Sequence, residues 1–267
     1  MTTTVGIGLL GCGTVGASVA DRLQHERERI VERTGVSYRL RAIAIRDRTK
    51  RRPESLEREL FTTAARAVVD DPRVDVVVEL IGGLDHAADL VEHALRRGQH
   101  VVTANKDLIG TQGPQLRLLA ESAGVSLRYD AAVGGAVPVL RTLDEGLAGD
   151  EILRVTGVLN GTCTAILSAM EAGSSFEKAL ADAQRLGYAE ADPSNDIAGI
   201  DAAHKLAIIA QTAFGAPLLS PQIPTRGIRG ITQADLANAR SQGLRIRVVA
   251  GVKRTRPTTT FAPAPVW

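Results

Sequence analysis

Short apolar runs alternate with longer amphipathic segments along the first half of the chain. Runs of this kind are typical of strands covered on both faces, whereas apolar residues that recur every three or four positions are typical of the covering helices. The alternation predicts an α/β fold with a doubly wound parallel sheet over residues 1–130. We expect strands at 5–10, 40–45, 75–81, 100–103 and 127–131, and helices at 17–33, 85–97 and 110–124.

The second half has a different pattern and predicts an α+β domain over residues 131–253. It opens with the glycine-rich, nearly uncharged AAVGGAVPVL and continues with a strand at 152–159 and several helices, the last at 232–239. Residues 244–252 alternate between apolar and charged side chains, which predicts a half-exposed strand. The final segment, 254–267, has no periodicity, and we expect it to be disordered.

A glycine motif joins the first predicted strand to the first helix. Gly11, Gly13 and Gly16 have the spacing G-x-G-x-x-G and enclose Thr14 and Val15. In a Rossmann-type fold the first glycine permits a tight turn, the second lets the backbone approach a pyrophosphate, and the third lets helix and strand pack closely. The motif predicts a dinucleotide site. A glycine turn without a ligand is the alternative.

The second predicted strand ends where such folds recognise the adenosine ribose. Asp47 is suited to a free 2′-hydroxyl, while Arg46 and its basic neighbours favour a 2′-phosphate. The chemistry of this segment is therefore mixed, and it slightly favours NADP over NAD. The basic residues are Arg46, Arg48, Lys50 and Arg51.

Three further segments are candidates for binding. Lys106 follows the fourth strand at its carboxyl end, the edge at which open α/β sheets bind ligands, although a solvated loop lysine explains it equally well. Asp130 and the carbonyls of the glycine-rich loop are able to coordinate a hard monovalent cation, or the loop is only a hinge. Asn160 and Thr162 either bind substrate or nicotinamide, or form a turn and a helix cap.

The segment 187–205 concentrates charge before an almost wholly apolar helix. It contains the carboxylates Glu190, Asp192, Asp196 and Asp201 and the ammonium of Lys205. Asp201 and Lys205 are four residues apart and lie on one helical face, so we expect an ion pair. An exposed pair of this kind is ordinary, but the apolar flanks indicate partial burial, which is costly and points to a site.

The overall composition favours small solutes as partners. The chain has 267 residues, 32 Lys and Arg against 30 Asp and Glu, and two cysteines, Cys12 and Cys163. Balanced charge gives no basis for binding nucleic acid or a membrane, and the cysteine usage fits a reducing cytoplasm. We therefore expect a cytoplasmic protein without a signal peptide or membrane helix.

Together these residues predict hydride transfer to or from a small polar substrate. Reducing a carbonyl requires a proton donor for the developing alkoxide, and Lys205 oriented by Asp201 meets this need. Glu190 and Asp196 are suited to a cationic group on the substrate, such as an amino-acid ammonium. The residues alone predict an oxidoreductase for an ammonium-bearing alcohol or aldehyde.

The chain resembles the homoserine dehydrogenase family in four motifs, which have that family's order and spacing. They are Gly11–Gly16, Thr103–Lys106, Asn160–Thr162, and GYAEADP at 187–193 continuing to GIDAAHK at 199–205. The resemblance implies NAD(P)-dependent interconversion of L-homoserine and L-aspartate 4-semialdehyde, in the biosynthesis of threonine, methionine and isoleucine, by a homodimer formed through the second domain.

The resemblance also assigns residues. It implies that Lys205 is the proton donor, that Glu190 holds substrate and that Lys106 lies near nicotinamide and substrate. It places a sodium ion near the glycine-rich loop, at Asp130, Val133, Gly135 and Val137.

The chain departs from the family in three places. Asp130 replaces a usual Glu, Cys163-Thr164-Ala165 replaces Thr-Asn-Tyr, and RTRPTTTFAPAPVW stands where the family continues, which suggests a shifted reading frame or a degraded gene. Two alternatives therefore remain open beside an active enzyme. One is a shortened, non-catalytic dinucleotide-binding remnant, and the other is a related dehydrogenase for another amino-acid-like substrate.

Overall fold

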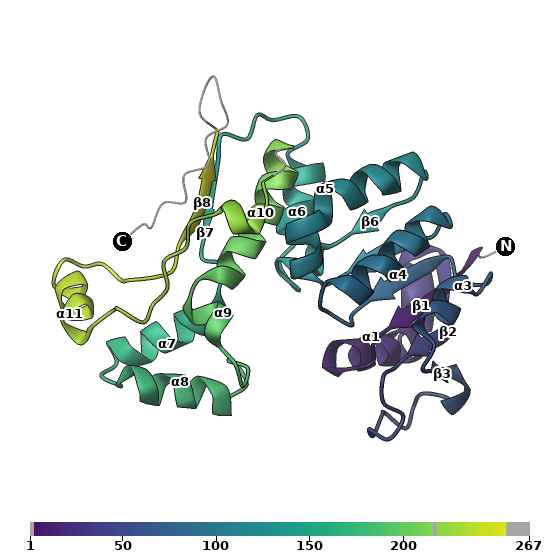
Figure 1. Ribbon diagram of the computed structural model, residues 1–267, viewed down its shortest axis with the longest axis horizontal. Helices are drawn as coiled ribbons and strands as arrows, with labels where there is room; N and C mark the ends of the chain where they lie inside the picture. Colours follow the sequence, from purple (N-terminus) through teal and green to yellow (C-terminus); the bar gives the residue numbers. More distant parts are fainter. Residues whose placement is uncertain (1–2, 216–217, 255–267) are drawn as a thin grey trace. The chain divides into compact units, whose positions relative to one another are not determined.

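The computed structural model describes residues 3–215 and 218–254. The chain forms two compact units that divide between Pro138 and Val139, somewhat later than the boundary after Asp130 that the sequence pattern predicts. Each unit is described separately below. Figure 1 shows the elements of both.

Unit 1 is built on a six-stranded, wholly parallel sheet with the order β3-β2-β1-β4-β5-β6. This order reverses between β1 and β4, as in a Rossmann-type doubly wound sheet, and confirms the predicted fold class. The strands are β1 (Thr3–Leu10), β2 (Val36–Ala44), β3 (Phe61–Thr62), β4 (Val76–Glu79), β5 (His100–Thr103) and β6 (Leu127–Arg128).

Helices cover both faces of this sheet. Leu9 packs with Ala20 of α1, whereas a side chain at Gly8 would meet Val68 of α3. Because successive strand residues point to opposite faces, α1 and α3 lie on opposite sides. α3 contacts α4, which contacts α5. The helices are α1 (Thr14–His25), α2 (Arg27–Thr34), α3 (Ala65–Asp70), α4 (Asp85–Arg96) and α5 (Lys106–Ser122), with 3-10 turns at Arg58–Leu60 and Asp130–Ala132.

Several boundaries in unit 1 differ from the prediction. The helix expected over 17–33 is two helices that meet at Glu26, and α2 has no buried residue to hold it in line with α1. The sequence predicts Asp85 as an N-cap, because Asp is a preferred capping residue, but Asp85 is the first residue of α4 and the N-cap is Leu84. α5 begins at Lys106 instead of near Gly110, because the Asn105 side chain accepts a hydrogen bond from the Leu108 amide and caps the helix.

Unit 2 is mostly helical and confirms the predicted mixture of helices with a small sheet. A two-stranded antiparallel sheet pairs β7 with β8. The elements are α6 (Val139–Arg141), a π-helical turn (Thr142–Gly146), β7 (Arg154–Gly157), α7 (Gly161–Glu171), α8 (Phe176–Arg185), α9 (Ser194–Ile197), α10 (Ile200–Phe214), a 3-10 turn (Ser220–Gln222), α11 (Gln233–Ser241) and β8 (Ala250–Lys253).

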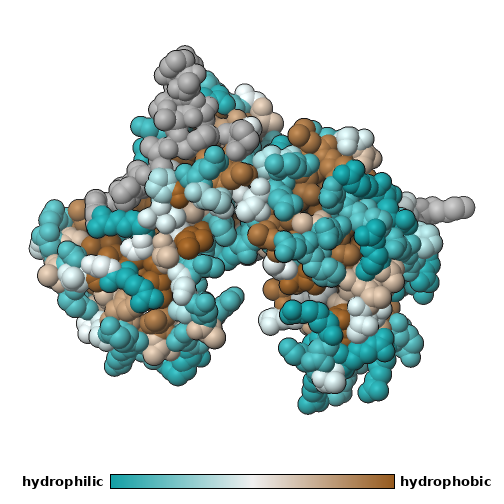
Figure 2. All heavy atoms as spheres, viewed as in Figure 1, coloured by the Kyte–Doolittle hydropathy of each residue, from teal (hydrophilic) through white to brown (hydrophobic). Residues whose placement is uncertain are grey.

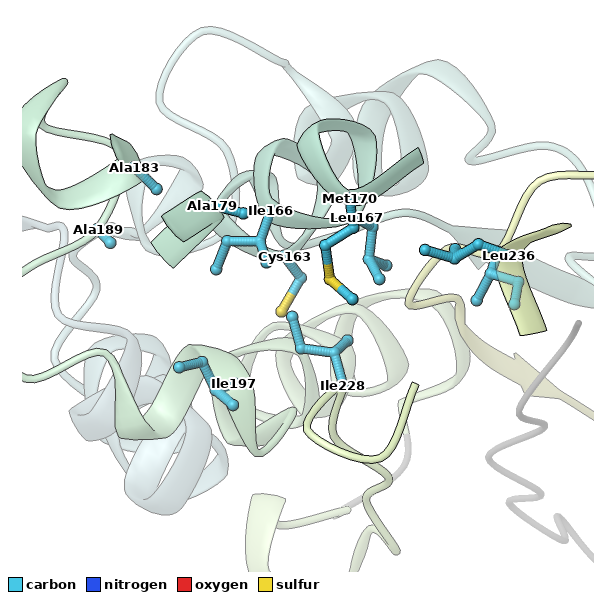
Figure 3. Packing of buried hydrophobic residues seen from close by; sticks show 11 residues of the cluster. Cys163, Ile166, Leu167, Met170, Ala179, Ala183, Ala189, Ile197, Ile228 and Leu236 are labelled. Atoms are coloured by element: carbon cyan, nitrogen blue, oxygen red, sulfur yellow. The ribbon is translucent and has the colours of Figure 1, made fainter. Parts of the chain in front are cut away.

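Two hydrophobic clusters hold unit 2 together. In the first, α7 packs against α8, α9 and α11, and Figure 3 shows the Cys163 sulfur pointing toward Ile228 at its centre. The second joins α10 to the sheet through Leu206, Ala207 and Val252. α10 contributes buried residues over almost its whole length, as expected from its apolar sequence. The charged residues of the same helix, Asp201 and Lys205, therefore lie among buried apolar side chains.

Two expectations for unit 2 are wrong in detail. Only Ala250–Lys253 of the predicted strand 244–252 is a strand, because its partner β7 offers four residues for pairing. The capping-box pattern of Ser174 and Glu177 predicts a cap at Ser174, but Ser175 caps α8. The sequence is also compatible with one helix from near Asp196 through Lys205, but the structure divides this segment into α9 and α10 at Gly199, whose φ of 82° favours glycine.

The predicted disordered segment 254–267 lies outside the described residues except for Arg254, whose backbone amide donates to the Leu153 carbonyl at 3.0 Å. In the described part of the chain, no helix is both long enough and apolar enough to cross a membrane.

Candidate active site

The glycine turn after β1 has the shape that a dinucleotide site requires. Gly11 has a φ of 99°, and a side chain there would lie 2.7 Å from the Leu80 carbonyl oxygen. A side chain at Gly16 would lie 2.2 Å from the Gly11 carbonyl oxygen, so helix and turn pack too closely for any other residue. At Gly13, by contrast, a side chain would meet no protein atom within 4 Å. The second glycine is therefore dispensable for packing and leaves open space for a ligand.

The first turn of α1 faces this space with its backbone donors. Gly13 is the N-cap residue, and no side chain caps the helix. Thr14 and Val15 are exposed, Val15 to 58%. Uncapped N–H groups and the positive end of the helix dipole favour a phosphate. The donor set fits the pyrophosphate of a dinucleotide.

The segment after β2 has the mixed character that its sequence predicts. Oδ1 of Asp47 accepts hydrogen bonds from the amide of Thr49 at 2.8 Å and from its hydroxyl at 2.6 Å. These bonds, with Lys50 and Arg52 nearby, lower the pKa of Asp47. Arg46 is exposed. Figure 2 shows a mainly hydrophilic surface over the loop between β2 and β3.

Lys106 occupies the first position of α5, directly after the Asn105 cap. Asn105 is buried, and its side-chain amide donates to the Gly83 carbonyl at 2.7 Å. The loop after β4 and the start of α5 are thus tied together at the carboxyl edge of the sheet. This arrangement gives Lys106 a fixed backbone position, which a loop lysine would lack.

The glycine-rich loop near Asp130 offers oxygen atoms. The Asp130 carbonyl accepts the amides of Val133 and Gly134. Within the described residues, by contrast, the carbonyls of Val133, Gly135 and Val137 accept no hydrogen bond from the protein. Carbonyl oxygens together with a carboxylate suit a hard cation. These oxygens are of the chemical type that a sodium ion binds, and the sodium ion itself stays a prediction.

In unit 2 the structure confirms the predicted ion pair. Lys205 Nζ lies 2.9 Å from Asp201 Oδ2, and the exposed fractions of the two side chains are 20% and 3%. Nζ also donates to the Leu159 carbonyl at 3.0 Å. The ammonium is therefore held from two sides and retains some exposed surface. A lysine in this position is able to exchange a proton with a bound molecule.

Asn160 joins the pair to a second carboxylate. Its Nδ2 donates to Asp201 Oδ2 at 2.9 Å and to Asp196 Oδ1 at 2.7 Å, while its Oδ1 accepts the Cys163 amide and caps α7. Asn160 is 3% exposed. One amide thereby fixes two carboxylates from α9 and α10 relative to α7. The sequence places Asn160 near a site but does not indicate this bridge.

The other acidic residues of the segment lie outside this cluster. Glu190 is exposed in the loop before α9, where its backbone carbonyl accepts from Gln184. Asp192 accepts hydrogen bonds from Ser194, which lower its pKa. Thr162 donates to the Tyr188 carbonyl at 2.7 Å and so holds this loop against α7. Of the residues predicted in unit 2, the structure brings together Asp196, Asp201 and Lys205.

The thiol of Cys163 lies beneath the two carboxylates. Its Sγ donates to the Asp196 carbonyl at 3.1 Å, and the residue is fully buried. Burial, and then the negative charges of Asp196 and Asp201, raise the pKa of Cys163 to about 12. The thiol therefore remains neutral and serves as a donor within the core.

This raised pKa predicts a loss of stability in alkali. The unfolded thiol ionises near its ordinary pKa of 9.0 while the folded thiol stays protonated to about 12, so the unfolded state binds fewer protons above pH 9. We expect a fall in the free energy of unfolding that approaches about 1.4 kcal/mol per pH unit. Urea unfolding from pH 8 to 10.5 measures it.

The matched control is Cys163→Ser, which keeps a donor but does not titrate in this range. The difference in unfolding free energy between wild type and this variant should shrink as the pH rises. A constant difference would contradict the assignment.

Known proteins match both units. The family model for the NAD binding domain of homoserine dehydrogenase matches residues 11–130, and the homoserine dehydrogenase model matches residues 138–265. The homoserine dehydrogenase of Bacillus subtilis is 38% identical over 249 residues, which cover 93% of this chain and 58% of that protein. The chain thus spans less than two thirds of that relative.

Solved structures agree. A homoserine dehydrogenase from Thiobacillus denitrificans superposes with a TM-score of 0.89 at 42% identity, covering 95% of this chain and 59% of the other. A putative homoserine dehydrogenase from Archaeoglobus fulgidus superposes with a TM-score of 0.83 at 35% identity. This match covers 98% of the present chain and 84% of the other.

A hyperthermophilic archaeal homoserine dehydrogenase in complex with NADPH gives a TM-score of 0.78 at 26% identity, covering 99% of this chain and 83% of the other. Unit 1 is therefore a nicotinamide-cofactor-binding domain, in agreement with its glycine turn. With both units matched and its motifs in place, the chain belongs to the homoserine dehydrogenase family.

Proposed function

We propose that the protein interconverts L-homoserine and L-aspartate 4-semialdehyde with NADP as cofactor, in the cytoplasmic synthesis of aspartate-family amino acids. One observation carries the proposal. The family's motif residues Asp201 and Lys205 form a largely buried ion pair, which Asn160 of a second motif holds in place. Desolvated ionisable groups of this kind concentrate at active sites.

The chemistry of the pair follows from its contacts. When bound, the reduced nicotinamide supplies the hydride. Lys205 donates the proton that neutralises the alkoxide oxygen, and accepts it in the reverse direction. Asp201 and the Leu159 carbonyl orient the ammonium, because both accept from the same Nζ. Asp201 is thus a catalytic residue through its direct contact with the proton donor.

Substrate recognition is assigned to three charged residues, two in unit 2 and one in unit 1. Glu190, whose side chain is exposed, and Asp196 suit the substrate ammonium, and Lys106 suits its carboxylate. The assignment of Asp196 is supported by its hydrogen bond to Asn160, because Asn160 also bonds to Asp201 and so fixes the two carboxylates relative to each other.

The cofactor preference rests on the segment after β2. Arg46 and its basic neighbours are exposed and favour a 2′-phosphate, while the Asp47 carboxylate accepts two hydrogen bonds from Thr49. The NADPH complex of the archaeal homologue agrees with this preference. Gly11, Gly13, Thr14, Val15 and Gly16 would hold the pyrophosphate.

Replacing Gly13 with alanine should separate cofactor binding from folding. A side chain at Gly13 meets no protein atom within 4 Å, so the melting temperature should not change, while NADPH binding weakens by about tenfold or more. Gly16→Ala should instead lower the melting temperature, because its side chain would lie 2.2 Å from a carbonyl oxygen. Fluorescence titration with NADPH and thermal unfolding measure both. Unchanged NADPH affinity in Gly13→Ala would contradict the assignment.

A sodium ion and a homodimer complete the proposal. The cation would be held by the Asp130 carboxylate and the carbonyls of Val133, Gly135 and Val137, and would rigidify the loop. Association is supported by exposed apolar side chains at both ends of β7, Leu153 at 61% and Val158 at 50%.

The absorbance of NADPH mixed with the full chain and L-aspartate 4-semialdehyde tests the proposed function. Consumption that depends on the aldehyde supports it. NADPH binding without consumption would instead identify a non-catalytic protein. Turnover only with another amino-acid-like carbonyl compound would identify a related dehydrogenase.

A further inference from the structure

The buried carboxylate of Glu79 has no role in the chemistry proposed so far. Glu79 is the last residue of β4, whose other residues are all valine, and it is 0% exposed. Its Oε1 accepts the backbone amides of Ile81 at 2.9 Å and Gly82 at 3.0 Å, and its Oε2 accepts the Thr103 hydroxyl at 2.5 Å. A buried ionisable group is costly unless donors satisfy it, so these bonds explain how Glu79 is tolerated but not why it is present.

The bonds of Glu79 belong to a closed ring of contacts. Thr103 Oγ1, which donates to Glu79, also accepts the Asn105 amide at 2.9 Å. The Asn105 side chain in turn donates to the Gly83 carbonyl at 2.7 Å, next to the Gly82 amide that Glu79 holds. The ring therefore links the turn after β4 to the start of α5. We call this set, Glu79, Gly82, Gly83, Thr103 and Asn105, the β4–β5 ring.

The ring bonds to two backbone features at this edge of the sheet, the turn after β4 and the start of α5. Gly82 and Gly83 have φ values of 68° and 77°, a left-handed conformation that glycine adopts without the steric cost that other residues have, and one that Gly82 and Gly83 therefore also leave easily when no bond holds them. Asn105 caps α5 through the Leu108 amide, and Lys106 is the first residue of that helix. Removing the carboxylate would take the acceptor from the Gly82 amide and from the Thr103 hydroxyl, and would so loosen the turn and the junction that sets the Lys106 backbone.

The ring lies on the half of the sheet that accepts the second nucleotide. The strand order reverses between β1 and β4, and a dinucleotide spans that point at the carboxyl edge. The glycine turn after β1 and Asp47 after β2 serve the pyrophosphate and the adenosine half. The ends of β4 and β5, where Glu79 and Thr103 lie, serve the nicotinamide half.

We propose that Glu79 is a positioning residue for the nicotinamide half of the cofactor, acting through the β4–β5 ring on the Gly82–Gly83 turn and on Lys106. The inference rests on the proposed use of a nicotinamide cofactor and is independent of which aldehyde is reduced. It predicts a selective effect. Weakening the ring should affect contacts with nicotinamide and leave contacts with the adenosine half intact.

The test compares two ligands that differ only in nicotinamide. The first ligand is NADPH, and the second is ADP-ribose that carries a 2′-phosphate, called the fragment below. Both contain the adenosine and the pyrophosphate, so a defect in the fold alone would weaken the binding of both. In Glu79→Gln, which keeps shape but loses one acceptor, we expect Kd for NADPH to rise by about tenfold and Kd for the fragment to stay within about twofold. Calorimetric titration of the folded full chain measures both constants without turnover.

Thr103 provides a matched pair in the same ring. Thr103→Val keeps the shape and removes the hydroxyl, so it should reproduce the selective loss of NADPH affinity. Thr103→Ser restores the hydroxyl and should bind both ligands as the wild type does. This pair decides the question even if Glu79→Gln does not fold.

Asp75→Asn is the control at the opposite edge of the sheet, where the Asp75 carboxylate accepts the Gly6 amide at 2.7 Å. It should leave both affinities unchanged. The proposal would be overturned if the ring variants bound NADPH and the fragment with equally reduced affinity, or if neither affinity fell. A wild type that binds the fragment as tightly as NADPH would also overturn it. A wild type that shows the NADPH preference but reduces no aspartate semialdehyde would reject only the proposed function.

Discussion

Lys205→Ala is expected to lower kcat by about 10²–10⁴-fold with L-aspartate 4-semialdehyde, which is the usual cost of losing a general acid. The ammonium is held by Asp201 and the Leu159 carbonyl, and the Lys205 side chain is 20% exposed, so it is not sealed from a bound molecule. Because the residues assigned to the cofactor's pyrophosphate all belong to unit 1, Kd for NADPH should change little. Steady-state kinetics and fluorescence titration measure the two quantities.

Lys178→Ala is the matched control, since Lys178 is an exposed lysine on α8 of the same unit. It should retain wild-type kcat and NADPH affinity. If Lys205→Ala lost NADPH affinity while keeping kcat at saturating cofactor, Lys205 would be a cofactor ligand and not the proton donor.

Asp201→Leu is expected to destabilise the protein by about 3 kcal/mol, the lower end of the cost of breaking a buried ion pair, because Lys205 is partly solvated. Asp201 is 3% exposed, and its Oδ2 accepts from both Lys205 and Asn160. Removing it leaves a partly buried ammonium and a buried amide that have each lost an acceptor. The midpoint of urea unfolding measures the change.

A double-mutant cycle with Lys205→Met isolates the pair. Once both charges are gone, the hydrophobic replacements fit an apolar helix, so the double variant should lose less stability than the sum of the single losses. Strict additivity would show that the two charges do not interact in solution and would remove the physical basis for calling the pair a site.

The features that depend on local sequence could be predicted. The glycine turn follows from G-x-G-x-x-G between a strand and a helix, and the geometry confirms it at Gly11 and Gly16. The Asp201–Lys205 pair follows from helical periodicity alone. The parallel sheet follows from buried apolar runs of strand length.

The features that depend on residues far apart in the sequence could not be predicted. Asn160 reaches Asp196 and Asp201 across separations of 36 and 41 residues, and no periodicity predicts which amide meets which carboxylate. Glu79 is visible in the sequence as one polar residue at the end of an apolar run, but its partner Thr103 is set by the pairing of β4 with β5. Predicted helix starts were wrong where a side-chain cap sets the first residue, as Asn105 does for α5 and Ser175 does for α8.

Transfer of a labelled hydride tests the central claim most directly. The full chain is mixed with L-aspartate 4-semialdehyde and NADPH deuterated at its transferable position, and the product is analysed by mass spectrometry. The account predicts homoserine that carries the deuterium on its hydroxyl-bearing carbon, and little of it from Lys205→Ala in the same time. Tight binding of the labelled cofactor without deuterated homoserine from the wild-type chain would contradict the account.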